Sequence, residues 1–340
     1  MSDILVAVSG GVDSSVAAYV LKKEGFNVSG VYMRLASAKD ESGDAFNAAQ
    51  NLGIGFHVSD KREQFKQTVV SRFAQEYLKG LTPNPCVFCN ENMKFPALFE
   101  KADELGISLT ATGHYAGIYE RGGVYYLRKS KNTAKDQSYM LYRLSQKMLS
   151  RLMFPIGDMN KDDVRTLAEE GNIPVAHKAD SQDICFVPDG DYRPIIAEYG
   201  ALSAKTGDFI YEDGRIIGKH KGISAYTIGQ RKGLGIAWEH PLYVIGKDIK
   251  ENRVLLGKNE SLFTDSLIAS CVVYCSEQMP SVFRCEAKVR YSHSGAMCTV
   301  TQLAPDKVSV KFDTHQRAIT PGQSVVFYDG ETVIGGGYID

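Results

Sequence analysis

The first half of the chain alternates short apolar runs with segments whose apolar residues recur at helical spacing. The strand-like runs are residues 4–7, 27–33, 55–58 and 109–114, and the helix-like segments are residues 15–23, 45–52, 63–79 and 94–105. This alternation predicts an α/β domain with a doubly wound, mostly parallel sheet that helices cover on both faces. Because ligands of such sheets bind at the carboxyl ends of the strands, Ser9, Met33 and Gly113 are expected to line one pocket.

From about residue 200 the pattern changes to short β-type runs separated by glycines. These runs are residues 208–211, 243–246, 283–291, 297–303, 308–312 and 324–328. Short strands at close spacing predict a small β-rich central domain followed by a C-terminal β-barrel-like domain. The expected division is 1–199 for the catalytic domain, 200–262 for the central domain and 263–340 for the C-terminal domain.

Composition narrows the class of protein without naming a function. The chain has 340 residues, of which 44% are apolar and 23% charged, as is typical of a globular protein of two or three domains. It has no apolar run of membrane-spanning length and starts without the features of a signal peptide, so a cytoplasmic protein is expected. The net charge of −1 gives a nucleic-acid partner no general support. Any RNA contact would therefore depend on local basic stretches, such as residues 128–135.

The segment Val8-Ser9-Gly10-Gly11-Val12-Asp13-Ser14 carries the strongest chemical signal. It joins an apolar strand to a helix, and its two glycines let backbone amides surround an anion at the positive end of the helix dipole. It matches neither the Walker A loop nor the Gly-x-Gly-x-x-Gly turn. It resembles the pyrophosphate loop of enzymes that cleave ATP between the α and β phosphates. An ordinary glycine-containing strand–helix turn is the simpler alternative.

Seven cysteines without secretory features favour thiol chemistry or metal binding over a disulfide scaffold. Cys86 and Cys89 form a C-x-x-C next to Pro83 and Pro85, and these prolines predict a rigid extended loop before the cysteines. On its own such a pair fits a redox couple, half of a zinc site or part of an iron–sulfur site. Cys185, between Ile and Phe, reads as a buried apolar side chain when taken alone.

Six segments, in one order, resemble the tRNA-specific 2-thiouridylases over essentially the whole chain. They are residues 9–14, 82–89, 112–115, 135–139, 181–186 and 226–235. The resemblance implies an enzyme, a tRNA-uridine 2-sulfurtransferase that uses ATP with Mg²⁺ to thiolate the wobble uridine (U34) in the anticodon loop. It also implies a sulfur-donor partner, such as a cysteine desulfurase or a sulfur-relay protein, and no membrane.

The resemblance also assigns roles to individual positions. The implied ATP site comprises Ala7, Val8, Ser9, Gly10, Gly11, Val12, Asp13, Ser14, Met33 and Gly113. The implied contacts to the target base are Asn84, Pro85 and Cys86. The implied tRNA contacts are His114, Lys135, Asp136, Gln137, Arg290, Tyr291 and Gln323. Cys89 matches the nucleophile, and Cys185 matches the cysteine that carries sulfur as a persulfide and forms a transient disulfide with Cys89.

These roles agree with the chemistry. A uridine 2-oxygen is a poor leaving group, so ATP first converts it to an adenylate, and prearranged amides stabilise the departing pyrophosphate. Attack of Cys89 on a Cys185 persulfide then releases sulfur. The target base has to leave its stack to reach ATP.

One departure from the family opens a second mechanism. Many members carry an acidic residue where this chain has Cys86. Three cysteines, Cys86, Cys89 and Cys185, are the number that holds a [4Fe–4S] cluster with one open iron. Persulfide relay is the favoured mechanism, and cluster-borne sulfide is the alternative. The other candidate functions are a different adenylylating enzyme, such as an amidating synthetase or another tRNA-modifying ligase, and a tRNA-binding or sulfur-carrier protein without turnover.

Overall fold

A five-stranded parallel sheet forms the centre of the N-terminal domain. The computed structural model describes residues 1–36, 42–174, 184–187, 190–199, 205–275 and 279–340. The strands lie in the order β3-β2-β1-β4-β7. Their bounds are β1 (Asp3–Ala7), β2 (Asn27–Arg34), β3 (Gly55–Asp60), β4 (Leu109–Ala111) and β7 (Leu152–Met153). The predicted α/β domain is confirmed, and the strand order reverses between β1 and β4, which is where such sheets bind ligands.

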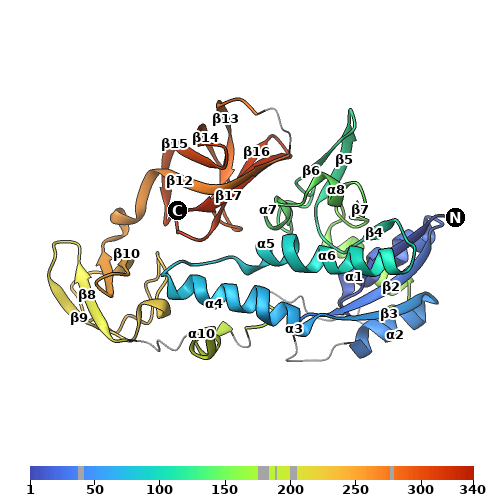
Figure 1. The fold of residues 1–340 in the computed structure, drawn as a ribbon, viewed down its shortest axis with the longest axis horizontal. Coiled ribbons are helices and arrows are strands. Elements are labelled where there is room, and N and C mark those ends of the chain that lie inside the picture. The colour runs from blue at the N-terminus through green and yellow to red at the C-terminus, as the bar shows by residue number, and fades with distance from the viewer. Residues whose placement is uncertain (37–41, 175–183, 188–189, 200–204, 276–278) are drawn as a thin grey trace.

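Helices cover this sheet on both sides (Figure 1). Their bounds are α1 (Val12–Lys23), α2 (Ser42–Leu52), α3 (Arg62–Phe65), η1 (Lys66–Val70), α4 (Ser71–Leu78), α5 (Pro85–Cys89), η2 (Asn90–Lys94), α6 (Phe95–Glu104), α7 (Ser138–Leu141), α8 (Gln146–Leu149), α9 (Lys161–Glu170) and α10 (Arg193–Tyr199). The π-helical turns η1 and η2 each join two α-helices into one continuous helix. The predicted helix at 94–105 therefore begins earlier, at Pro85.

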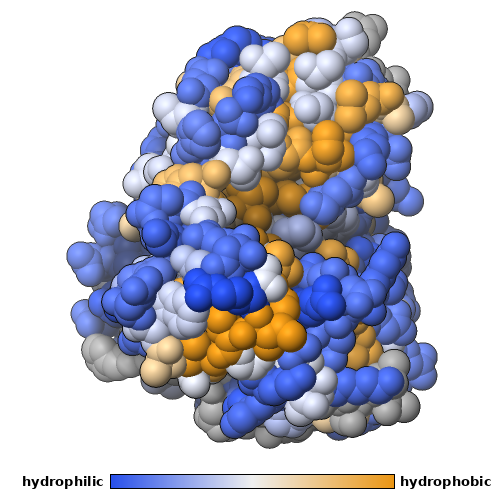
Figure 2. Space-filling model, turned by 90° about the vertical axis from the view of Figure 1, so that its left-hand side faces the viewer, coloured by the Kyte–Doolittle hydropathy of each residue, from blue (hydrophilic) through white to orange (hydrophobic). Residues whose placement is uncertain are grey.

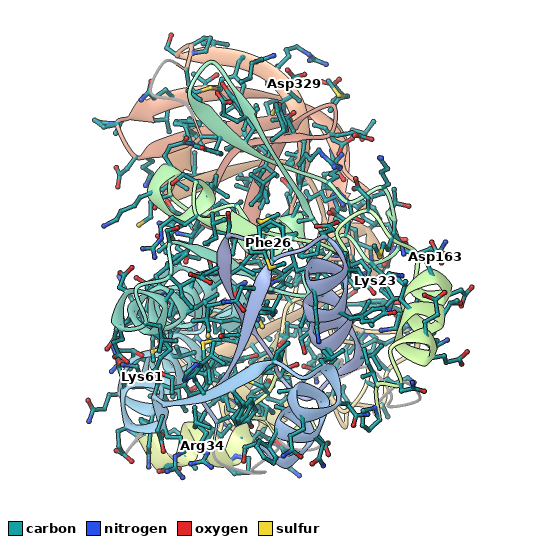
Figure 3. All side chains as sticks on the ribbon, turned by 90° about the vertical axis from the view of Figure 1, so that its right-hand side faces the viewer. Lys23, Phe26, Arg34, Lys61, Asp163 and Asp329 are labelled. Carbon is teal, nitrogen blue, oxygen red and sulfur yellow. The ribbon has the colours of Figure 1, made fainter. Side chains whose placement is uncertain are left out.

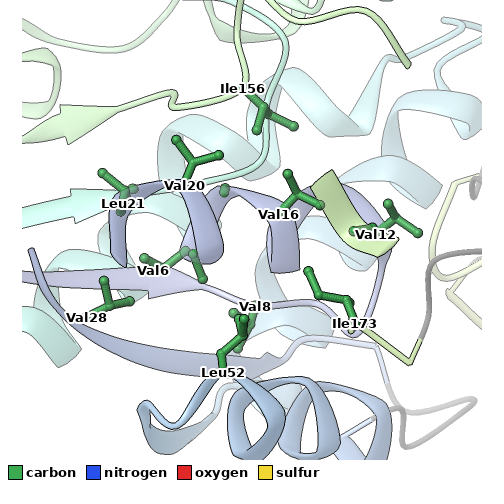
Figure 4. Packing of buried hydrophobic residues seen from close by; sticks show 14 of the residues in the cluster. Val6, Val8, Val12, Val16, Val20, Leu21, Val28, Leu52, Ile156 and Ile173 are labelled. Carbon is green, nitrogen blue, oxygen red and sulfur yellow. The ribbon is translucent and has the colours of Figure 1, made fainter. Parts of the chain in front are cut away.

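Small aliphatic side chains hold α1 against the sheet. Val6 of β1 and Val8, which directly follows this strand, meet Val12 and Val16 of α1 in one buried cluster (Figure 4). Helix α9 packs on the other side of α1, and Figure 3 shows Lys23 and Asp163 on these two neighbouring helices. The loop between β1 and α1 is thus anchored at both ends by rigid, buried elements.

The central domain is a four-stranded sheet in the order β10-β11-β8-β9. Its elements are β8 (Gly207–Tyr211), β9 (Ile216–His220), η4 (Ile223–Ala225), β10 (Tyr243–Asp248), β11 (Arg253–Gly257) and η5 (Asn259–Leu262). Its own core surrounds Phe209 and Val254. The predicted small β-rich unit is confirmed.

Six strands form the closed C-terminal barrel, which confirms the expected barrel-like domain. They are β12 (Phe263–Tyr274), β13 (Val282–Lys288), β14 (Ala296–Ala304), β15 (Lys307–Arg317), β16 (Ser324–Asp329) and β17 (Thr332–Ile339). Pairing of β12 with both β15 and β17 closes the ring.

A hairpin from the N-terminal domain extends the sheet of this barrel. Its strands are β5 (Gly117–Arg121) and β6 (Val124–Arg128), and β6 pairs with β17 through Arg128 and Thr332. The sequence pattern did not predict that β6 pairs with β17, because β17 lies far along the chain from this hairpin. No helix among the described residues is long and apolar enough to cross a membrane.

Candidate nucleotide and thiol site

The loop between β1 and α1 has the shape that an anion-binding turn requires. Gly10 takes a positive φ of 77°, and Gly11 is the N-cap of α1. The hydroxyl of Ser14 donates to the carbonyl of Gly11 at 3.1 Å and accepts from the backbone N–H of Ser9 at 3.0 Å. The first turn of α1 is therefore held open toward the carboxyl edge of the sheet, where helix N-termini bind phosphates.

Asp13 is the charged residue of this loop and it is already paired. Its Oδ1 accepts from Lys161 Nζ at 2.8 Å and from the hydroxyl of Tyr115 at 2.8 Å. Lys161 begins α9, far from the loop in sequence, and its side chain is largely buried. The sequence motifs did not point to this lysine.

Gly113 makes the closest approach to the loop. A Cβ on this residue would lie 2.6 Å from the carbonyl carbon of Asp13 and 2.7 Å from the nitrogen of Ser14. Only a glycine fits, so the end of β4 touches the loop backbone directly. Met33, at the end of β2, is partly buried against the core. The structure thus brings the end of β4 to the loop, at the edge where the strand order reverses.

The C-x-x-C cysteines lie on a short helix rather than in an extended loop. Asn84 is the N-cap of α5 and accepts from the backbone N–H of Cys86 at 3.2 Å, and Pro85 occupies the first turn. Pro85 fits there because the first helical N–H groups need no partner within the helix. Cys86 faces solvent and Cys89 is buried. The expected extended loop is correct only up to Asn84.

Helix α5 is fixed to the segment that carries several predicted tRNA contacts. Asn84 Nδ2 lies 3.2 Å from the sulfur of Met140, and Asn90 Nδ2 donates to the carbonyl of Met140 at 3.0 Å. Met140 lies on α7, which directly follows Lys135, Asp136 and Gln137. The segment 135–141 thus connects the thiol helix to the rest of the site.

All three candidate thiols have a raised pKa. Burial raises the pKa of Cys89 to about 12, and nearby Cys185 and Cys86 add to this effect, while Lys94 opposes it. Burial raises the pKa of Cys185 to about 11, again with a contribution from Cys86. Partial loss of hydration also raises the pKa of Cys86, although this side chain reaches the surface, and the charge of Lys94 lowers it. The three cysteines are therefore close enough to influence one another's pKa. All three thiols are protonated at neutral pH.

The described cysteines do not form a site for a single metal ion. Among the described residues, no group of three or more His, Cys, Asp or Glu side chains is placed to hold a metal ion, and Cys86, Cys89 and Cys185 are all among those residues. Of the motif at 181–186, residues 181–183 lie outside the described part of the chain.

The predicted tRNA contacts make well-defined contacts within the protein. Asp136 is buried and accepts from the backbone N–H groups of Ser130 and Ser138 at 3.0 and 3.2 Å. Gln137 Oε1 accepts from the backbone N–H of Tyr115 at 2.9 Å. Gln323 Nε2 donates to the carbonyl of Thr82 at 2.7 Å, so it holds the chain just before the thiol helix.

The remaining predicted contacts lie near these. Tyr291 is exposed, and its ring centroid lies 6.3 Å from that of Tyr139. Arg290 donates to the carbonyl of Arg317 at 3.0 Å. Lys135 and His114 are both half-buried, and His114 contacts Lys94. The structure thus gathers residues from the end of β4, segment 135–141 and the barrel around the thiol helix.

The basic stretch at 128–135 is not a free positive patch. Arg128 and Lys131 pair with Asp158 at 2.7 and 3.4 Å, and Lys129 pairs with Glu286 at 2.7 Å. The two carboxylates offset two of the three positive charges, so the group keeps a net positive charge. These ion pairs weaken the expected basic patch at Arg128, Lys129 and Lys131, and its contact with RNA stays a prediction.

The central domain carries an apolar surface. Leu234, Ile236, Trp238 and Leu242 line a shallow groove there. Figure 2 shows apolar residues gathered on this face of the molecule. Further apolar residues lie in the hollow between its upper and lower parts in this view. None of the candidate catalytic residues lines this groove.

Comparison with known proteins places these features in a family. Residues 2–189 match the model described as tRNA methyl transferase HUP domain, residues 196–258 the PRC-barrel domain and residues 264–339 the aminomethyltransferase beta-barrel domain. The tRNA-specific 2-thiouridylase MnmA of Syntrophotalea carbinolica is 46% identical over 99% of this chain and 98% of its own length. The tRNA-specific 2-thiouridylases of Clostridioides difficile and Geobacter metallireducens are 45% and 42% identical over 99% of this chain and 98% and 96% of theirs. The chain therefore belongs to the family of tRNA-specific 2-thiouridylases.

Proposed function

We propose that this protein catalyses ATP-dependent 2-thiolation of the wobble uridine (U34) of tRNA, with 2-thiouridine, AMP and pyrophosphate as products. One observation carries the proposal. The helix with Cys86 and Cys89 is bonded to segment 135–141, and this segment is also bonded to the end of β4, which touches the nucleotide loop. The near full-length relatives named for 2-thiouridylation support the choice of substrate.

In the first step the uridine 2-oxygen attacks the α-phosphorus of ATP. The bond to the β-phosphate oxygen breaks, and pyrophosphate leaves with the electron pair. Backbone amides at residues 9–14 and the dipole of α1 are suited to stabilise that charge. Mg²⁺, when bound, offsets phosphate charge, and the carboxylate of Asp13 is the kind of oxygen ligand that it prefers.

In the second step sulfur replaces the adenylated oxygen. The thiolate of Cys89 attacks the inner sulfur of a Cys185 persulfide, forms a Cys89–Cys185 disulfide and releases hydrosulfide. Hydrosulfide adds at C2 of the uridine, the C2–oxygen bond breaks and AMP leaves. An external thiol then reduces the disulfide. The protonated state of the thiols at neutral pH means that Cys89 needs a base or a bound substrate to form its thiolate.

We further propose the partners that this reaction needs. Asn84, Pro85 and Cys86 border the pocket for the extruded base, and the residues at 114, 135–137, 290–291 and 323 contact the tRNA around it. A cysteine desulfurase or a sulfur-relay protein delivers the persulfide sulfur to Cys185. The substrate places this reaction in the cytoplasm.

The decisive experiment is incubation with ATP, Mg²⁺, a cysteine desulfurase with cysteine and unmodified tRNA, followed by nucleoside mass spectrometry. We expect 2-thiouridine at position 34 and one pyrophosphate per thiouridine. Cys89→Ser and Cys185→Ser should abolish the product. Cys271→Ser is the matched control, because Cys271 is an exposed cysteine on the barrel. A fully active Cys89→Ser protein would instead favour another adenylylating activity.

Anaerobic purification separates the two sulfur mechanisms. For persulfide relay we expect a colourless, active protein in which Cys86→Ala reduces 2-thiouridine formation without abolishing it, because Cys86 then only borders the base pocket. Stoichiometric iron together with loss of activity in that variant would replace the relay by a [4Fe–4S] mechanism.

A further inference from the structure

Lys94 is a partly buried cation without a carboxylate partner among the described residues. It ends η2, one and a half helical turns after Cys89, and its side chain is half-buried. Its Nζ lies 3.3 Å from Nε2 of His114. No carboxylate among the described residues pairs with it. Because withdrawing an unpaired charge from water is costly, such a site is suited to an anion that the protein itself does not supply.

The imidazole of His114 holds the ammonium of Lys94 in place but, being neutral, does not offset its positive charge. Nδ1 of His114 lies 2.6 Å from Oγ1 of Thr112, and the rings of Phe95 and Phe154 pack near the imidazole, with centroids at 5.7 and 5.8 Å. Burial and then the charge of Lys94 hold the pKa of His114 well below its ordinary value, so the ring is neutral. A neutral ring that donates from Nδ1 to Thr112 accepts from Lys94 at Nε2.

Lys94 is close both to a residue beside the nucleotide loop and to the candidate thiols. On one side, His114 directly follows Gly113, which touches the backbone of Asp13 in the nucleotide loop. On the other side, the charge of Lys94 acts on Cys86, Cys89 and Cys185. An anion bound to Lys94 would therefore face both the nucleotide loop and the thiols.

We propose that the ammonium of Lys94 binds the phosphate of the uridine adenylate, the species that joins the two half-reactions. This inference rests on the proposed function. The adenylate phosphate keeps a negative charge after pyrophosphate leaves, and AMP leaves with a second one when the C2–oxygen bond breaks. In this role Lys94 is a catalytic residue through its positive charge and not through proton transfer.

The test compares three lysine variants with unmodified tRNA. We expect Lys94→Met to lower the rate of tRNA-dependent pyrophosphate release by about 10²-fold, as loss of a charge-stabilising donor does. Lys94→Arg keeps the charge and should lose less. Lys101→Met is the matched control, because Lys101 lies on the following helix and pairs with Glu104 on the surface. Affinity for tRNA and the melting temperature should stay near the wild-type values in all three.

A second variant tests the inference if Lys94→Met fails to fold. Thr112→Val removes the partner of Nδ1 but keeps the lysine, and it should slow pyrophosphate release by about tenfold through misorientation. Wild-type pyrophosphate release in Lys94→Met would overturn the inference. Normal pyrophosphate release with loss of 2-thiouridine would overturn it too, because Lys94 would then act in the sulfur-transfer step and not on the adenylate. Absence of pyrophosphate release in the wild type would instead overturn the proposed function.

Discussion

At the scale of single residues, the site depends on close contacts between backbone segments. The nucleotide loop is formed by a strand–helix connection, but its shape is completed by Gly113 from another strand. Asp13 is held by Tyr115 and Lys161 in the same way. Substitutions at these contacts are therefore expected to affect catalysis more than folding.

Gly113→Ala tests the contact with the loop. Its Cβ would come within 2.6 Å of the Asp13 carbonyl carbon, so the loop has to move. A displacement of this size is expected to lower ATP-dependent pyrophosphate release by about 10²-fold. The measurement is the rate against ATP concentration, with Gly43→Ala as control, because a Cβ at Gly43 meets nothing within 4 Å. Equal rates for the two variants would show that the close approach has no role in catalysis.

At the scale of secondary structure, the continuous helix from Pro85 to Glu104 organises the chemistry. Its first turn carries Cys86 and Cys89, and its π-helical turn ends at Lys94. π-helical turns inside α-helices often occur at functional sites. Here the turn also brings the backbone N–H of Lys94 to the Cys89 thiol, where it lowers the pKa.

Asn84→Ala tests whether the start of this helix positions the thiols. Loss of the N-cap should cost about 1 kcal/mol of stability and lower 2-thiouridine formation, because the amide of Cys86 loses its acceptor. Asn84→Asp keeps the capping oxygen and should recover most of the stability. Ser145→Ala removes the cap of α8 and serves as control. The idea fails if this control loses as much activity as Asn84→Ala.

At the scale of the whole molecule, the barrel and the central domain both contact the segment just before the thiol helix. Gln323 and Pro321 of the barrel bond to the backbone of Thr82. Arg143 donates to Glu91 at 2.6 Å and to the carbonyl of Cys271 at 2.8 Å, so it joins the thiol helix to the barrel. The barrel is therefore connected by hydrogen bonds to the segment and the helix that carry the candidate thiols.

Lys247 lies at the joint between the central and N-terminal domains. Burial lowers its pKa from 10.5 to about 8, and its Nζ donates to the carbonyl of Gly80 at 3.1 Å. Between pH 8 and 10.5 the unfolded chain holds a proton that the folded protein has lost, so the free energy of unfolding rises with pH in this range.

The measurement is urea unfolding of the wild type and Lys247→Met at pH 7 and pH 10. The wild type should gain about 1 to 3 kcal/mol relative to the variant over this interval. A difference that does not change with pH would mean that Lys247 keeps its ordinary pKa in the folded protein.

Local patterns in the sequence were sufficient for most strands of the parallel sheet, for the change to β domains and for the main chemical groups. The strand–loop–helix at the start, the C-x-x-C and the change to short strands after residue 200 are all encoded by neighbouring residues. Helical and strand periodicity follows from local backbone geometry, so it is readable without the fold. The start of the thiol helix at Pro85 was missed, because an X-Pro step more often interrupts a helix than begins one.

Tertiary structure decided what no local pattern encodes. Lys94 faces His114, Lys161 reaches Asp13 and the hairpin at residues 117–128 joins the barrel, each across a long stretch of chain. The raised thiol pKa values follow from burial and from charges that only the fold brings together. The sequence by itself therefore determined which groups are available, and the packing of distant segments decided which of them meet and in which protonation state.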